Sequence, residues 1–224
     1  MKGANPLAVR FGIKNFKQLN SEIEKLKKAP QTVLDRTLAD VKTRVPGWVS
    51  TEVAKEYGIK KKEVGDGKTS SLRIVGNKMP NVRLEYSGRM LTPAHFSMSP
   101  KAPKEDRGAY TLKATIVKGE RKAIGHVKKL TKKQRKDMAK NFRKEGTRNS
   151  PQSPWMLQTT GAKSPDKVAY IPFQRQKQPG KFDHVFRTVS VPQMIDNKAA
   201  PGIQKAIDEG LSKRLDHHMK ILQK

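Results

Sequence analysis

The sequence predicts an α+β fold in which N- and C-terminal helices pack on a mostly antiparallel sheet of about five strands. Three observations lead to this prediction. Apolar residues recur at helical spacing near both ends of the chain, and they alternate with a period of two in the middle. The 14 prolines and 16 glycines interrupt the chain too often for one long coiled coil. We expect a single domain over residues 1–224.

Two helices are predicted in the first quarter of the chain. Apolar residues three and four apart indicate a helix over 15–28, which Pro30 ends. A second helix is predicted over about 31–57, and Pro46 with Gly47 is expected to kink or split it. The apolar stripe of this second helix consists of Val33, Leu34, Leu38, Val41 and Val45.

The C-terminal region also predicts two helices. Ser190 is placed to cap the first, because Pro192 follows at a preferred first-turn position and Gln193 completes the spacing of a capping box. A longer helix is predicted over about 199–222. Its apolar residues recur every four positions, which predicts a buried face. They are Ile203, Ile207, Leu211, Leu215 and Met219.

The strands are predicted from alternating apolar residues. Residues 72–74 and 82–86 form a β-hairpin candidate, and a third strand is predicted over 110–117. Two further strands are predicted over 168–173 and 185–189. The Ser-, Pro- and Gly-rich stretch 149–167 is interpreted as a loop.

Charge is the most unusual property of the chain. It carries 48 Lys and Arg against 20 Asp and Glu, a net charge of +28, which predicts a polyanionic neighbour. Residues 118–148 concentrate this charge and are interpreted as a basic insertion with a helix that ends near 144. Its candidate contacts to DNA or to a protein partner are Lys128, Lys129, Lys132, Lys133, Arg135 and Lys136. The alternative is a solvated charged helix without a partner.

Several kinds of chemistry are excluded or not expected. The chain has no cysteine, which excludes disulfides, thiolate metal sites and cysteine nucleophiles. We expect no cofactor, no metal and no catalytic residue, because no base, nucleophile and orienting carboxylate stand in a recognisable pattern. There is no apolar signal-peptide stretch or run long enough to span a membrane. We therefore expect synthesis in a cytoplasm-like compartment and no membrane partner.

Three local motifs have simpler interpretations than a catalytic or metal site. Residues 65–69, GDGKT, lack the earlier glycine and the strand of a phosphate-binding P-loop, so a mobile turn is expected. His217 and His218 are adjacent on a helix and cannot chelate one ion together. We expect them to face the dipole at the helix C-terminus. His95 is expected in the core or at an interface.

Two longer segments resemble a known family. Residues Phe186–Ile195 read FRTVSVPQMI and are followed by a helix that ends LSKRLDH at His217. This stretch is similar to the C-terminal signature of the phage minor tail protein Z family. Gly88–Met98, GRMLTPAHFSM, and Ala114–Gly119, ATIVKG, resemble the middle of the same family. The resemblance covers about 31–222, and the long basic insertion departs from it.

The resemblance implies a structural virion protein of long-tailed phages. Such proteins are made in the host cytoplasm and act in tail completion and head–tail joining at the neck, as rings around the DNA channel. It implies as partners other copies of the chain, neighbouring tail or neck proteins and, as a further candidate, the phage DNA in the lumen. Candidate core or assembly residues are His95, Phe96, Met194, Ile195, Leu211 and Leu215.

Two other function classes remain open on the sequence alone. One is a sequence-independent nucleic-acid-binding protein, which the charge favours but the 6% aromatic content and the absence of a base-reading motif do not. The other is an enzyme with a dispersed site. Assembly into a ring or a tail would favour the structural protein, whereas a monomer that binds duplex DNA tightly would favour the nucleic-acid-binding protein.

Overall fold

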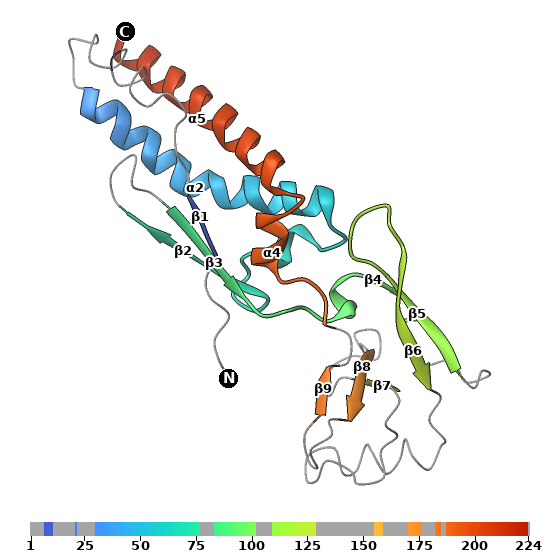
Figure 1. The fold of residues 1–224 in the computed structure, drawn as a ribbon. Coiled ribbons are helices and arrows are strands. Elements are labelled where there is room, and N and C mark those ends of the chain that lie inside the picture. The colour runs from blue at the N-terminus through green and yellow to red at the C-terminus, as the bar shows by residue number, and fades with distance from the viewer. Residues whose placement is uncertain are drawn as a thin grey trace. The chain divides into compact units, whose positions relative to one another are not determined.

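The computed structural model describes residues 7–10, 21, 30–76, 83–101, 109–128, 155–158, 170–175, 182–184 and 187–223. The chain divides into two units (Figure 1). Unit 1 combines Met1–Arg89 with Ser190–Lys224, and unit 2 is Met90–Val189. Unit 2 is thus inserted in the sequence between two parts of unit 1. The sequence predicts a single domain over residues 1–224 and does not indicate that its middle part forms a second compact unit.

Two long helices form the core of unit 1. They are α2 (Pro30–Glu56) and α5 (Ala200–Gln223), and they pack along each other (Figure 1). Among the residues that the structure describes in unit 1, the short helices α4 (Val191–Asp196) and η1 (Lys61–Glu63) accompany this pair. We call the buried apolar residues of the pair the helix seam. On α2 they are Val33, Leu38, Val41, Val45, Val49 and Val53, and on α5 they are Ile203, Ile207, Leu211 and Leu215.

The second helix continues through Pro46 and is not split there. Figure 1 shows that its ribbon bends near the middle. Proline removes one backbone hydrogen bond from a helix interior. Val45 and Val49, on either side of Pro46, have no exposed surface, and their packing offsets that loss. The predicted first helix, 15–28, lies outside the described residues except for Ser21, which is helical.

A three-stranded antiparallel sheet accompanies the helices of unit 1. Its order is β1 (Leu7–Arg10), β3 (Arg83–Gly88) and β2 (Ser70–Val75). The predicted hairpin is confirmed, because Tyr86 lies opposite both Leu72 on β2 and Leu7 on β1. Tyr86 is 1% exposed, and desolvation raises the pKa of its phenol. Helix α4 packs on β3 and β1, which buries the centre of the sheet.

Unit 2 contains two further sheets of three strands. The first has the order β4 (Ser97–Ser99), β5 (Ala109–Thr115) and β6 (Lys122–Lys128), and it is preceded by the 3-10 helix η2 (Pro93–His95). Its apolar cluster consists of Met98, Tyr110, Leu112 and Val127. The register between β5 and β6 shifts after Leu112, where Ile124 has no partner in the ladder, as in a β-bulge.

The other sheet of unit 2 has the order β7 (Trp155–Gln158), β8 (Tyr170–Arg175) and β9 (Phe182–His184), also antiparallel. Strand β7 lies inside the loop predicted over 149–167. Its first three residues, WML, are apolar in succession rather than alternating with polar residues, so periodicity gives no strand signal there. The strand predicted over 185–189 is displaced: the pairing residues are Phe182–His184, and residues 187–189 are not in a strand.

The α+β class and the antiparallel pairing are confirmed, but the strands that the structure describes form three small sheets instead of one sheet of about five. The reason lies in the pairing of the central strands. Strand β3 pairs with β1 and β2, and β5 pairs with β4 and β6, so the strands predicted over 82–86 and 110–117 do not pair with each other. The basic insertion predicted over 118–148 is also corrected at its start, because residues 122–128 form β6 and belong to a sheet.

Candidate functional site

The two longer segments behind the family resemblance meet at Leu91. The backbone N–H of Thr188 donates to the carbonyl of Leu91 at 2.9 Å, and the Thr188 hydroxyl donates to the same oxygen at 2.8 Å. The N–H of Leu91 donates in turn to the carbonyl of Val189 at 3.4 Å. Leu91 and Thr188 are both buried, although they are 97 residues apart in the sequence. Buried backbone groups need such partners, so this junction fixes the two segments to each other.

The capping box predicted at Ser190 is present and begins α4. The Ser190 hydroxyl accepts from the N–H of Gln193, and the Gln193 side chain accepts from the N–H of Ser190 at 2.9 Å. The helix that follows places Met194 and Ile195 in the interior, where they are 0% and 1% exposed. On α5, Leu211 and Leu215 lie in the helix seam. These four residues therefore act as core residues of unit 1.

His95 and Phe96 lie at the end of η2 in unit 2. Their backbone N–H groups donate to Thr92 and Pro93, which closes the turn. Phe96 is buried and His95 is half-buried.

The basic residues singled out from the sequence are only partly described. Lys128 is the last residue of β6 and lies opposite Ala109 in the register of the sheet. Lys129, Lys132, Lys133, Arg135 and Lys136 lie outside the described residues. Their contacts to DNA or to a protein therefore stay predictions.

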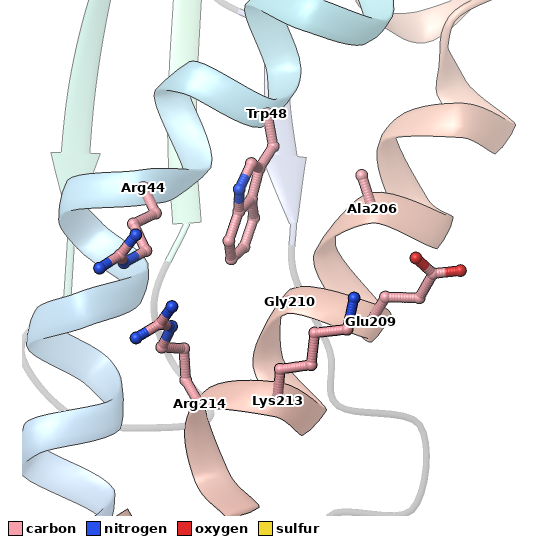
Figure 2. A pocket seen from close by; sticks show the side chains of 7 residues that line it. All are labelled: Arg44, Trp48, Ala206, Glu209, Gly210, Lys213 and Arg214. Carbon is pink, nitrogen blue, oxygen red and sulfur yellow. The ribbon is translucent and has the colours of Figure 1, made fainter. Parts of the chain in front are cut away.

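A pocket that the sequence patterns did not indicate lies between α2 and α5 (Figure 2). Its volume is about 320 Å³. We call it the α2–α5 pocket. Helix α2 contributes Arg44 and Trp48, and α5 contributes the remaining lining residues, which are Ala206, Glu209, Gly210, Lys213 and Arg214. The cationic residues outnumber the single carboxylate, so the pocket is suited to an anionic group.

Close contact between the helices shapes the wall of this pocket. A Cβ atom placed on Gly210 would lie 2.1 Å from the Trp48 ring, so only glycine allows the indole to approach α5 this closely. Likewise, a Cβ on Gly202 would lie 2.7 Å from a Glu52 oxygen. These contacts pair later residues of α2 with earlier residues of α5. The two helices are therefore antiparallel, and side chains four residues apart on each line up along the contact.

An ion-pair cluster continues the same contact beyond the pocket. Asp40 lies one turn before Arg44, and its Oδ2 accepts from Nε2 of His218 at 3.2 Å. The same oxygen is 3.7 Å from Nη1 of Arg214. His217 touches His218 edge to face, with ring centroids 5.3 Å apart. The expectation that His218 faces the helix dipole is therefore corrected, because its partner is a carboxylate on the other helix.

The GDGKT segment is a hydrogen-bonded turn. Gly65 and Gly67 have positive φ, which glycine adopts without strain. Asp66 accepts from the N–H groups of Lys68 and Thr69 at 2.8 and 2.7 Å. Desolvation acts to raise the pKa of the Asp66 carboxyl, but the hydrogen bonds, led by the Thr69 side chain, lower it to about 2. These backbone N–H groups, which would have to bind a phosphate in a P-loop, already donate to the Asp66 carboxylate.

Metal ligands do not gather in the part of the chain that the structure describes. There, no group of three or more His, Asp and Glu side chains could hold a metal ion. None of the helices described is both long and apolar enough to cross a membrane. Comparisons of the chain with protein-family models, with curated proteins and with solved structures gave no match.

Proposed function

We propose that the chain is a structural protein of a phage tail, which acts in tail completion and head–tail joining at the neck as a ring around the DNA channel. The observation that carries the proposal is the junction at Leu91 and Thr188. Segments that resemble the minor tail protein Z family in sequence are hydrogen-bonded to each other there. The resemblance thus falls on residues that act together in the fold, rather than on unrelated surface loops.

The distribution of residues in unit 1 also supports a role in assembly. The resembling helix α5 uses one face for the helix seam and leaves charged side chains on its other faces, including Lys213, Asp216 and Lys220. A subunit in a ring must be stable through its own core and must also present surface to its neighbours. The proposed partners are other copies of the chain and adjoining tail or neck proteins.

Co-purification with tails tests the proposal. The chain is produced with an affinity tag in the cell that carries its gene. Particles are then separated by sedimentation, and mass spectrometry identifies the fractions that contain the chain. We expect the tagged chain in the tail fraction. When the chain is not produced, we expect heads and tails that have not joined. Absence from every particle fraction, with normal particles formed without it, would contradict the proposal.

A second function, sequence-independent nucleic-acid binding, is favoured by the net charge of +28. The triple variant Lys132→Glu, Lys133→Glu and Lys136→Glu separates the two. If these residues contact DNA, binding to duplexes of any sequence falls alike, and the dependence of affinity on salt becomes shallower. If they contact a protein, DNA binding stays unchanged and tails fail to join heads. Normal DNA binding and normal joining would show that the segment is solvated and has neither role.

A further inference from the structure

The α2–α5 pocket gathers cations that lack sufficient counter-charge. Figure 2 shows the guanidinium groups of Arg44 and Arg214 near each other beside the indole of Trp48. The ammonium of Lys213 lies on the other side of the ring, toward Glu209, whose carboxylate is directed away from the two arginines. Two guanidinium groups from different helices therefore converge on one space, where their charges repel each other.

Only part of this charge is neutralised within the described structure. Arg214 has Asp40 as a partner at 3.7 Å, and the same Asp40 oxygen also binds His218. Among the residues that the structure describes, neither Arg44 nor Lys213 forms an ion pair. An anion bound in the pocket would relieve the repulsion, and arginine is well suited to bind planar oxyanions through two parallel hydrogen bonds.

The shape and the wall of the pocket favour a single side chain as the occupant. A volume of about 320 Å³ is at the low end for ligand pockets. The half-buried Trp48 adds an apolar wall, which suits the methylene part of an acidic side chain. Glu209 lines the pocket and Asp40 pairs with Arg214 beside it, and these carboxylates repel the closely spaced charges of a DNA backbone more than the single charge of one side chain. Tryptophan and arginine are also the residue types enriched where protein–protein binding energy concentrates.

We propose that the α2–α5 pocket binds the carboxylate of an Asp or Glu side chain on a neighbouring protein subunit. Arg44 and Arg214 hold the carboxylate, Lys213 adds positive charge, and Trp48 packs against the aliphatic part of the side chain. The carboxylate chemistry follows from the pocket itself. The identification of its owner as a neighbouring subunit rests on the proposed tail-assembly function.

Fluorescence of Trp48 gives a direct assay. The chain has two tryptophans, so Trp155→Phe leaves Trp48 as the only indole. The full-length Trp155→Phe protein is titrated with a short peptide rich in glutamate, with the same peptide carrying glutamine instead, with inorganic phosphate and with a duplex oligonucleotide. We expect a saturable change in Trp48 fluorescence with the glutamate peptide and none with the glutamine peptide.

A pair of matched double variants locates the response. Arg44→Gln with Lys213→Gln removes two pocket cations that have exposed side chains. Arg36→Gln with Lys220→Gln removes the same charge from exposed positions of the same two helices outside the pocket. We expect the pocket variant to weaken peptide binding at least about tenfold, which corresponds to the loss of one charge-assisted hydrogen bond, and the control to retain it. Exchange of the two residue types, Arg44→Lys with Lys213→Arg, keeps the charge but removes the guanidinium group of Arg44, so it should restore only part of the binding.

Three outcomes would overturn the proposal. An equal loss in the pocket and control variants would mean that only the overall charge attracts the peptide. A duplex-dependent fluorescence change that disappears in the pocket variant would assign the pocket to nucleic-acid phosphate, and an equal response to inorganic phosphate would remove the selectivity for carboxylate. Failure of tail incorporation together with normal peptide binding would leave the pocket chemistry intact and contradict the proposed function alone.

Discussion

The helix seam and the α2–α5 pocket lie on the same two helices but differ in the type of side chain that forms them. The seam consists of aliphatic side chains that repeat along each helix and exclude water, with Val45, Val49 and Ile207 almost without exposed surface. The pocket consists of charged and aromatic side chains on an adjacent strip of the same helices. Stability therefore resides in the seam, whereas the pocket retains charge that the fold does not need.

Removal of a seam side chain should have the largest effect. Leu211 is 6% exposed, so Leu211→Ala creates a cavity between α2 and α5 and should lower the free energy of unfolding by about 2–5 kcal/mol. Denaturant titration measures this change. The adjacent exposed residue provides the control, because Ser212→Ala should shift stability by less than about 0.5 kcal/mol. A Leu211→Ala effect as small as that of the control would show that the seam is not the core.

Two glycine substitutions test the contact that forms the pocket wall. Ala is favoured over Gly in a helix by about 1 kcal/mol, so Gly47→Ala on α2, where no atom lies within 4 Å of the new Cβ, should raise stability by about 0.5–1 kcal/mol. Gly210→Ala should instead lower stability by about 1 kcal/mol, because the new Cβ overlaps the Trp48 ring and overpacking outweighs helix propensity.

Thermal unfolding compares the stability of the two glycine variants, and fluorescence reports whether the environment of Trp48 has changed. Gly210→Ala should change the emission of Trp48 in the Trp155→Phe protein, and Gly47→Ala should not. Equal stabilisation by both substitutions would show that Trp48 does not lie against α5.

Loss of the ion-pair cluster should have the smallest effect. Asp40 is 32% exposed at its side chain, and partly exposed ion pairs contribute little, so Asp40→Ala should lower stability by about 0.2–1 kcal/mol. The effect should shrink at high salt because the charges are screened. Asp216→Ala removes the same charge from an exposed position on α5 and should not destabilise the protein. Chemical denaturation at two salt concentrations distinguishes these outcomes, and an equal, salt-independent loss in both variants would argue against the cluster.

The same contrast explains how much can be predicted from the sequence. The seam repeats every three or four residues, so the amino-acid pattern alone assigns Ile203 through Leu215 to a buried face. The capping box at Ser190 is a local signal and is equally predictable. Both depend on residues that are neighbours along one helix.

The pocket could not be predicted because its residues come from distant parts of the chain. Trp48 and Gly210 are ordinary in isolation, and only the antiparallel packing of α2 on α5 brings them together. The pairing of Asp40 with His218 spans 178 residues and has the same origin. One signal could have indicated this contact. Residues spaced four apart lie on one face of a helix. One such row on α2 is Asp40, Arg44 and Trp48, and the facing row on α5 is Gly210, Arg214 and His218. The division into sheets likewise depends on pairing between distant strands, such as β1 with β3.

We propose that the chain assembles around the tail axis. Electron microscopy of tails that contain the tagged chain, with the tag labelled, tests it most directly. The proposal predicts label at the head-proximal end of the tail, in a closed ring with rotational symmetry. Tails without label, together with a purified chain that stays monomeric and binds duplex DNA of any sequence, would contradict it.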